Sequence, residues 1–292
     1  MTASVVSKEL GDDCLLIEKT DQFGGTTALS GGVVWVPNND GMAKAGLHDS
    51  EEDGFAYMQA VVGPDVPVEK LKAYIKQAPA MLRFMEQHTH LTYFAADRYA
   101  DYYPELPGGK TGGRSMDPKP ISRRKLGKEA AKQRYPSYLT GFLRFGITVI
   151  ESREVMDMTL KGKYYMARNI LRYYLDIPSR LKGLPDNRYT LGRALVACCR
   201  LAMMDRDIPL WYNTEATNFI VRNGRVVGLE VKREGKTLKL QARKGVLMAA
   251  GGMGQNIALR QEFGQLPTGE SFSSDSPGNM GDAIRMGRDI GA

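Results

Sequence analysis

The pattern of apolar and polar positions predicts helices and strands in mixed order along the chain. An unbroken apolar run from Cys14 ends at Glu18 without alternation, which is typical of a buried parallel strand. Val68 to Gln87 has helical spacing and is expected to bend at Pro79. Its apolar positions include Leu71, Ile75, Ala78 and Leu82. The mixture predicts an α/β fold.

The remaining pattern predicts more helices and then a β-rich region. Helices are expected at Thr2–Leu10, Ser50–Val62, Met156–Tyr174 and Arg193–Met204, and one that opens at Gly281-Asp282. Strands are expected at Pro209–Asn213, Ala216–Arg222, Arg225–Arg233, Thr237–Ala242 and Lys244–Ala250. Asn223-Gly224 is a strong hairpin signal between two of these strands. Residues 104–140, rich in Pro, Gly and basic side chains, predict a long loop.

Composition narrows the class of protein. With 292 residues, 42% of them hydrophobic, the chain can bury a sizeable core. It has no apolar run of the ~18 residues that a transmembrane helix needs, and no signal peptide pattern at its start. Three cysteines cannot form a disulfide framework, which favours a cytoplasmic protein. Without C-x-x-C or a His/Cys cluster, no metal site is expected.

The formal charge of +7 is concentrated in the stretch from Lys110 to Arg193. We interpret this stretch as a solvated, loop-rich face. Nucleic-acid binding requires a recognisable module beside the charge, and the sequence contains none, so no nucleic-acid partner is expected. Attraction to anionic cofactor phosphates is a weaker alternative.

Glycine pairs and small hydroxyl residues follow the first predicted strand. Glu18, with Lys19 beside it, stands at the strand end, where an acid can accept hydrogen bonds from a ribose diol. Glycines beyond it let backbone amides approach phosphate and ring atoms. Any single glycine here is explained by a tight turn, but the whole pattern favours a cofactor loop. Its candidate binding residues are Glu18, Lys19, Gly24, Gly25, Thr26, Thr27, Ser30, Gly31 and Gly32.

Two later segments are candidates for the same cofactor. The hairpin that includes Ala216 precedes an apolar run ending in Ala250, Gly251 and Gly252. Asn279, Gly281 and Asp282 lie at a helix start, where free amides favour phosphate. Alone, the first segment is a plain meander and strand, and Asp282 is explained by the helix dipole. Their position downstream of the first motif favours the binding interpretation.

A fourth segment, DYYPELPGG from Asp101 to Gly109, is by composition only a tyrosine-bearing turn. No motif supports nucleophilic catalysis, because the chain lacks G-x-S-x-G and no His lies near Cys198 or Cys199. We expect those two cysteines to be core residues. The Tyr- and Met-rich helix Met156–Tyr174 is expected to be core as well, although a flat apolar ligand could also bind against such a helix.

Together these segments resemble the FAD-binding domain of 3-ketosteroid Δ1-dehydrogenases and their fumarate reductase-like relatives. The DYYPELPGG segment is typical of the steroid enzymes. The resemblance implies FAD as cofactor, with Glu18 at the adenosine ribose and Ser30 to Gly32 near the pyrophosphate or isoalloxazine. It implies that the backbone at Ala216 reaches the adenine and that Ala250 to Gly252 border the ADP part.

The same resemblance implies two further roles. It places Asn279, Gly281 and Asp282 near the ribityl and phosphate atoms, although Met280 and Ala283 replace the usual Thr and Gly. By register, Tyr102 is the candidate catalytic residue and Tyr103 the second choice. The family's tyrosine there lines the steroid site, and its hydroxyl supports a neighbouring proton-abstracting tyrosine. A buried phenol suits this task because it can polarise a partner or pass a proton.

The implied fold is an α/β, Rossmann-like FAD-binding domain of the two-dinucleotide-binding type, with a β-meander and helical insertions. Only 17 residues precede Glu18, so we expect this domain to lack its first strand and glycine-rich turn. It is expected to occupy residues 1–292, with an insertion at 104–188. The substrate domain and the catalytic base are expected beyond Ala292.

The implied activity is FAD-dependent desaturation of ring A of a 3-ketosteroid. A base removes a proton beside the ketone while the flavin accepts a hydride. One alternative is an inactive, truncated chain that binds FAD weakly or not at all. Another is a fumarate reductase-like enzyme for a small dicarboxylate, which the PELPGG segment disfavours. The steroid, the electron acceptor and the oligomeric state stay open.

Overall fold

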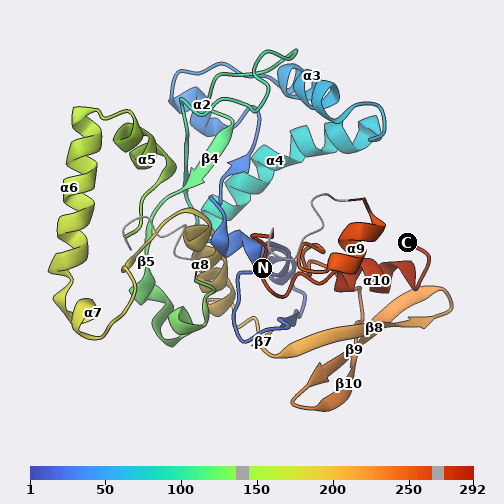
Figure 1. Cartoon of the computed structure of the whole chain (residues 1–292). Coiled ribbons are helices and arrows are strands. Elements are labelled where there is room, and N and C mark those ends of the chain that lie inside the picture. Colours follow the sequence, from blue (N-terminus) through green and yellow to red (C-terminus); the bar gives the residue numbers. More distant parts are fainter. Residues whose placement is uncertain (136–144, 265–272) are drawn as a thin grey trace.

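A computed structural model describes residues 1–135, 145–264 and 273–292 of the chain. It is a mixed α/β fold with small sheets joined by helices (Figure 1). Helix α8 (Leu191–Met204) lies centrally, α6 (Leu160–Leu175) forms one edge, and a β-meander projects at the opposite lower side (Figure 1). Between them, α4 (Val68–His88) extends toward α3 (Glu51–Val62).

A parallel pair joins the first predicted strand to a strand far along the chain. β1 (Leu16–Ile17) pairs with β7 (Leu210–Trp211), and both are shorter than the predicted runs. The contact continues past the ladder, because the Glu18 amide donates to the Trp211 carbonyl at 2.8 Å. Glu18 therefore stands at the end of a parallel pair, as its sequence position predicted.

The predicted hairpin is confirmed. β8 (Thr214–Arg222), β9 (Arg225–Arg233) and β10 (Lys236–Gln241) form an antiparallel meander. Asn223 and Gly224 have φ values of 50° and 72°. Positive φ at both central positions is what a type I′ turn requires, and it matches the twist of the flanking strands.

The strand predicted at Lys244–Ala250 is wrong. These residues have no regular secondary structure, and Leu247 is 73% exposed. A strand is stabilised by its ladder of backbone hydrogen bonds, and within the described ranges this segment pairs with no neighbour. Its apolar composition alone does not make it a strand.

Most predicted helices are confirmed. α1 (Thr2–Glu9) and α10 (Asp282–Arg288) lie where expected, and α3 begins after Ser50, whose side chain accepts from the Asp53 amide. α4 continues past Pro79 to His88. Cys198 and Cys199 are buried in α8, as expected of core residues.

The long loop predicted at residues 104–140 is wrong over much of its length. It contains β4 (Ser115–Pro118), β5 (Ile121–Ser122) and the 3₁₀ helix η2 (Arg123–Lys132); residues 136–140 lie outside the described ranges. These short strands have distant partners, which no local pattern reveals. β4 lies between β2 (Val34–Trp35) and β3 (Tyr93–Ala95), and β5 pairs with β6 (Arg188–Tyr189).

The helix predicted at Met156–Tyr174 consists of parts of two helices. α5 (Val149–Met156) ends before Met158, which has a φ of 55°, and Thr159 caps α6. A short helix, α7 (Ile177–Leu181), follows. The expectation that this region is core is wrong at Tyr164, Leu171 and Tyr174, which are 59–67% exposed. α6 packs mainly on α5 at the edge of the molecule, so one face stays uncovered (Figure 1).

The main core lies around α8. Its side chains pack with residues of α4, η2 and the loop after Glu18, whose 3₁₀ helix η1 (Thr26–Leu29) contacts α8 directly. Phe23 and Ala28 of that loop are 0% and 1% exposed. The core therefore holds the candidate cofactor loop in place by burying its apolar side chains.

Candidate functional site

The first and last glycine motifs meet at Thr26. Its hydroxyl oxygen accepts hydrogen bonds from the Ser276 amide and the Asn279 side-chain nitrogen, both at 3.0 Å. It also lies 3.5 Å from a carboxylate oxygen of Asp275. Segments about 250 residues apart in sequence are therefore joined by one hydroxyl group.

The second motif, which ends in Ala250, Gly251 and Gly252, lies at the same junction. The Gly281 amide donates to the Gly252 carbonyl at 3.0 Å, and the Gln255 amide donates to the Asn279 carbonyl at 3.0 Å. Three of the four segments that the sequence singled out are thus assembled into one site. Helix α9 (Ile257–Glu262) follows directly, with Asn256 as its N-cap.

An ion-pair group links the two ends of the chain beside this junction. The Lys19 ammonium lies 2.9 Å from Asp282 and 3.4 Å from Glu215. Burial alone would lower the pKa of Lys19, but the hydrogen bond and charge of Asp282 raise it above its usual value. Lys19 therefore stays charged and ties the two acids together. A pocket of about 490 Å³ lies against Lys19, Gly281 and Asp282.

Each glycine pair of the cofactor motifs, Gly24-Gly25, Gly31-Gly32 and Gly251-Gly252, contains one packed and one open glycine. A side chain on Gly24 would come within 2.8 Å of Ala28, on Gly32 within 2.4 Å of the Gly192 amide nitrogen, and on Gly251 within 2.4 Å of Asn279. At the partner glycines, Gly25, Gly31 and Gly252, a Cβ would meet nothing within 4 Å. The packed glycines let segments approach closely, while the open ones leave backbone accessible to a ligand.

Glu18 has acceptor capacity left over. Its Oε1 atom accepts from the amide and the hydroxyl of Thr20, both at 2.9 Å. Its Oε2 atom makes no hydrogen bond within the part of the chain that the structure describes. The carboxylate is thus held in place by one oxygen and can accept from a diol with the other.

Ser30 and Thr27 differ in what they do. The Ser30 hydroxyl donates to the Thr27 carbonyl at 2.9 Å and accepts from the Gly32 amide at 3.0 Å, so it braces the turn. Thr27 is exposed. The Ser30 hydroxyl therefore already hydrogen-bonds within the loop, whereas the exposed Thr27 hydroxyl is available to a ligand.

The remaining predicted binding residues lie on the meander and the segment after it. The ladder shifts register between Ala216 and Asn218, which leaves Thr217 as the extra residue of a β-bulge. Ala250 is exposed.

Tyr102 is not part of this assembly. It is 85% exposed, and Tyr103 is 51% exposed. Among the described residues, no hydrogen bond or ring contact joins Tyr102 to the glycine motifs. Its loop is held by a separate buried network.

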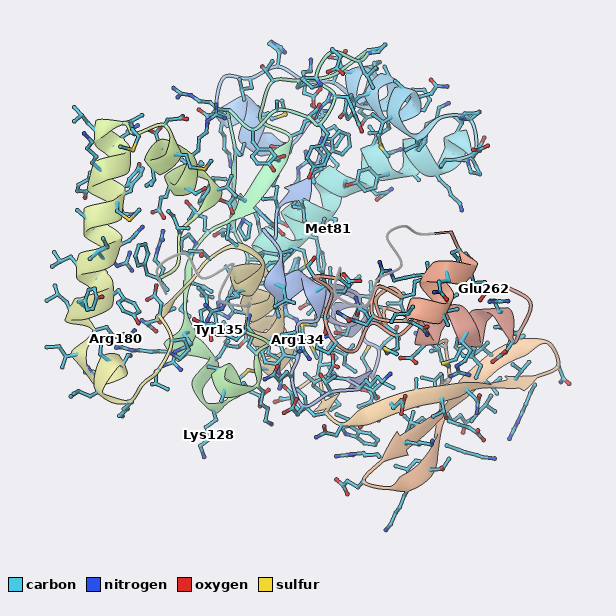
Figure 2. All side chains as sticks on the ribbon, in the orientation of Figure 1. Met81, Lys128, Arg134, Tyr135, Arg180 and Glu262 are labelled. Carbon is cyan, nitrogen blue, oxygen red and sulfur yellow. The ribbon has the colours of Figure 1, made fainter. Side chains whose placement is uncertain are left out.

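Sequence reasoning missed several residues at the junction. Asp275 precedes the third motif, and its carbonyl accepts from the Gln255 side chain at 2.7 Å. Arg134, near the middle of the view in Figure 2, donates to the Thr20 hydroxyl at 3.0 Å. Asp275 directly precedes Ser276, the first residue of the third motif, and this position could have marked it as a site residue. No local signal indicates Arg134, because its partner is over 100 residues away.

The basic stretch from Lys110 to Arg193 contains both exposed and buried basic side chains. Lys128 projects from the edge of the molecule (Figure 2), as a solvated face predicts. Arg114 instead has a side chain only 1% exposed. Within the described ranges, no group of three or more His, Cys, Asp or Glu side chains is placed to hold a metal. No helix there is long and apolar enough to span a bilayer.

Comparison with known proteins identifies the family. The family model described as FAD binding domain matches residues 1–292. The chain belongs to the FAD binding domain family. The open glycines and the free oxygen of Glu18 fit the polar parts of such a cofactor.

Two individual proteins are similar to the chain over its whole length. The chain is 34% identical over 300 residues to the 3-oxosteroid 1-dehydrogenase of Mycobacterium tuberculosis, covering 100% of the chain and 52% of the relative. A 3-ketosteroid delta1-dehydrogenase from Sterolibacterium denitrificans, solved with 1,4-androstadiene-3,17-dione, has a TM-score of 0.94 and 38% identity. That match covers 100% of the chain and 52% of the solved protein, so the chain spans about half the length of these relatives.

A third comparison concerns the fold alone. A flavocytochrome c3 fumarate reductase has a TM-score of 0.64 and 17% identity, covering 100% of the chain and 38% of that protein. The chain therefore has the mixed α/β fold of an FAD-binding domain, and the steroid dehydrogenase is the better structural match.

Proposed function

We propose that the chain is the flavin-binding part of an FAD-dependent dehydrogenase that desaturates ring A of 3-ketosteroids. The observation that carries this proposal is the match along the whole chain to a dehydrogenase solved with a steroid, with a TM-score of 0.94. The DYYPELPGG segment, typical of these enzymes, supports the steroid class over a small dicarboxylate.

The chain's contribution is to bind and orient. Glu18 accepts from the adenosine ribose with the carboxylate oxygen that Thr20 leaves free. The backbone at Gly25, Gly31 and Gly252, where a Cβ would meet nothing within 4 Å, approaches the phosphates and the ring. FAD, when bound, supplies the acceptor for a hydride from the steroid.

The proposed reaction also needs a group beside the ketone. Tyr102, or Tyr103 as second choice, supplies a phenol at the steroid site, where it hydrogen-bonds to the base that removes a proton. The role calls for a buried, hydrogen-bonded phenol, whereas both side chains are exposed in this structure, so the proposal requires the steroid or another segment to cover them.

Flavin uptake is the first test. The purified chain is mixed with FAD, freed of excess by gel filtration and examined for a visible flavin band. The same sample is then titrated anaerobically with a 3-keto-4-ene steroid. We expect a yellow protein, and we expect the steroid to bleach its flavin band once the substrate domain, which is expected to carry the catalytic base, is supplied with the chain. A colourless protein after incubation with FAD would refute the proposal.

A matched pair of variants tests the site itself. Glu18→Gln weakens the acceptor for the ribose, and we expect FAD affinity to fall about 10-fold or more, since a charged hydrogen bond contributes ~1.5–3 kcal/mol. Asp21→Asn changes an exposed acid in the same loop and should leave affinity unchanged. Equal affinities in both variants contradict the assignment of Glu18. Flavin oxidised by fumarate but never reduced by steroid would favour the fumarate reductase-like alternative.

A further inference from the structure

The segment from Asp101 to Lys110 forms a closed loop. The Asp101 amide donates to the Lys110 carbonyl at 2.9 Å, and the Lys110 amide donates to the Asp101 carboxylate at 3.0 Å. Inside the loop, the Leu106 amide donates to the Tyr103 carbonyl at 3.1 Å. The Gly109 amide donates to the Leu106 carbonyl at 2.8 Å. The loop is therefore a compact unit with adjacent ends.

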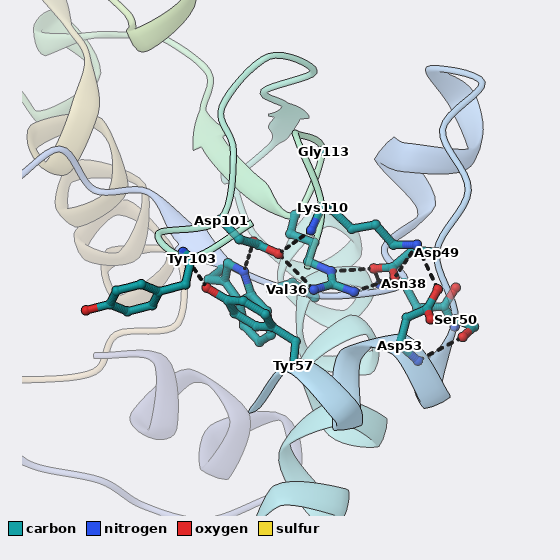
Figure 3. A network of polar contacts seen from close by, with 12 residues as sticks. Val36, Asn38, Asp49, Ser50, Asp53, Tyr57, Asp101, Tyr103, Lys110 and Gly113 are labelled. Carbon is teal, nitrogen blue, oxygen red and sulfur yellow. Dashed lines mark hydrogen bonds and ion pairs between the residues drawn. The ribbon is translucent and has the colours of Figure 1, made fainter. Parts of the chain in front are cut away.

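This loop packs closely on α3. Gly108 has a φ of 72°, and a Cβ there would lie 2.1 Å from the Asp53 carbonyl oxygen. The Tyr103 amide donates to the Tyr57 hydroxyl at 3.2 Å, and the Lys110 ammonium lies 2.7 Å from the Asp53 carboxylate. Backbone and side-chain contacts together determine where the loop lies (Figure 3).

Arg114 joins the loop to the rest of the molecule. Its guanidinium donates two hydrogen bonds to Asp49, at 2.8 and 2.7 Å, and one to Asp101 at 2.8 Å (Figure 3). All three side chains are 1% exposed. The guanidinium also lies 5.5 Å from the Trp35 ring centroid and 5.6 Å from that of Tyr57. Within this set, Asp101 belongs to the loop and Asp49 to the scaffold.

The charges in this group are stable because they are paired. Burial alone would raise the pKa of Asp49, but the hydrogen bonds and charge of Arg114 hold it below its usual value. Burial alone would likewise lower the pKa of Arg114, and its two acids raise it. Removing one partner from a buried ion pair is strongly destabilising, because the remaining charge is then uncompensated. Such a group permits one arrangement of the loop.

Asp101 also connects the loop from Asp101 to Lys110, here called the tyrosine loop, to the cofactor loop that follows Glu18 and ends at Gly32. The Trp35 indole nitrogen donates to the Asp101 carboxylate at 2.6 Å. Trp35 lies in β2, three residues after Gly32, which packs directly on α8. One carboxylate therefore accepts hydrogen bonds from the flank of the cofactor loop, from Arg114 and from the base of the tyrosine loop.

We propose that Arg114 is a positioning residue that, through Asp101, fixes Tyr102 and Tyr103 relative to the cofactor loop and presents them, already ordered, to the steroid. This inference rests on the proposed function. Two tyrosines that stand 85% and 51% exposed on an anchored loop lose little conformational freedom when a flat ligand packs on them. Placement also matters for rate, because displacement by about 1 Å can cost ~100-fold.

Two isosteric variants separate positioning from general stability. Asp101→Asn removes the charge on the loop side of Arg114, and Asp49→Asn removes the matching charge on the scaffold side. Both carboxylates are 1% exposed, so the two changes are matched in burial. Each is made in a Trp211→Phe background, which leaves Trp35 as the single tryptophan, since the chain has 2.

Three measurements are made on each variant: amide hydrogen exchange of residues 102–109, Trp35 fluorescence, and, with the substrate domain supplied, the rate of flavin reduction by saturating steroid. We expect Asp101→Asn to raise loop exchange about 10-fold and to shift Trp35 emission to longer wavelength. Its reduction rate should fall about 10- to 100-fold with FAD uptake unchanged. Asp49→Asn should lower the melting temperature without a selective rise in loop exchange.

The outcomes distinguish the inference from the function on which it rests. Unchanged loop exchange and emission in Asp101→Asn would overturn the inference, as would equal changes in both variants. A freed loop with an undiminished reduction rate would overturn it too, while the proposed function stands. If the parent chain binds FAD but no steroid reduces it when the substrate domain is supplied, the proposed function fails. Exchange and emission then still decide whether Asp101 holds the loop.

Discussion

At the scale of single residues, the most unusual carboxylate is Asp117 in β4, which is 0% exposed. Its Oδ2 atom accepts from the Val149 amide at the start of α5 at 2.9 Å, while Oδ1 has no hydrogen-bond partner among the described residues. Burial raises its pKa from 3.8 to about 7, and the nearby charge of Glu151 adds to the rise. The fold therefore favours the neutral acid at this position.

This preference predicts a pH-dependent stability. Because the folded-state pKa is raised, the stability contributed by Asp117 is present below pH ~4 and is lost as the pH rises through about 7. Asp117→Asn removes the ionisation. We expect the free energy of unfolding of Asp117→Asn, relative to that of the parent, to increase by a few kcal/mol as the pH rises from 4 to 8. The size follows from ~1.4 kcal/mol per unit of pKa shift.

Urea unfolding at several pH values between 4 and 8 measures this difference. Asp157→Asn serves as the control, since it removes a half-exposed carboxylate just after the same helix. Its difference from the parent should change little over this range. A difference for Asp117→Asn that is equally flat would show that Asp117 is ionised in the fold at neutral pH.

At the scale of elements, the contact between the turn after η1 and the start of α8 depends on one glycine of a pair. Gly32 has a φ of 64°, and a Cβ there would lie 2.4 Å from the backbone nitrogen of Gly192. The Gly192 amide in turn donates to the Ser30 carbonyl at 3.0 Å. We expect Gly32→Ala to lower the free energy of unfolding by about 2–4 kcal/mol, from backbone strain and overpacking together.

Gly31→Ala is the matched control, because a Cβ at Gly31 meets nothing within 4 Å. Its stability should stay within ~0.5 kcal/mol of the parent's in urea unfolding. If the open face at Gly31 binds FAD, the same variant should weaken flavin affinity without loss of stability. Equal stabilities of the two variants would contradict the close contact between the turn after η1 and the start of α8.

Elements that depend on local chemistry were predictable from sequence. The Asn223-Gly224 hairpin follows from turn residues that tolerate positive φ, and α3 follows from its Ser50 cap. Elements that depend on distant partners were not. β4 pairs with strands on either side of it, and the apolar run at Lys244–Ala250 lacks the partner that would make it a strand.

At the scale of the whole molecule, glycine and hydroxyl motifs predicted which segments meet but not how each residue is used. The structure joins the three glycine motifs, yet in the pairs Gly24-Gly25, Gly31-Gly32 and Gly251-Gly252 one glycine is packed and the other is open. Arg134 and Arg114 were missed, because a buried arginine carries no local signal of its partners. Tyr102 was placed by resemblance alone, and its role stays a prediction.

The junction at Thr26 yields a prediction about the whole chain. Its hydroxyl connects the N-terminal cofactor loop to Ser276 and Asn279, so Thr26→Val should release the C-terminal segment while preserving side-chain volume. We expect amide hydrogen exchange at residues 273–282 to rise about 10-fold, as the loss of one or two hydrogen bonds of ~1 kcal/mol each predicts. Thr27→Val is the control, because Thr27 is exposed and its hydroxyl makes no hydrogen bond within the described ranges. An equal rise in both variants would show that the effect does not come from the Thr26 hydroxyl, and an unchanged rate in Thr26→Val would mean that other contacts hold the two ends together. The Lys19–Asp282 ion pair, at 2.9 Å, is the first of these to test.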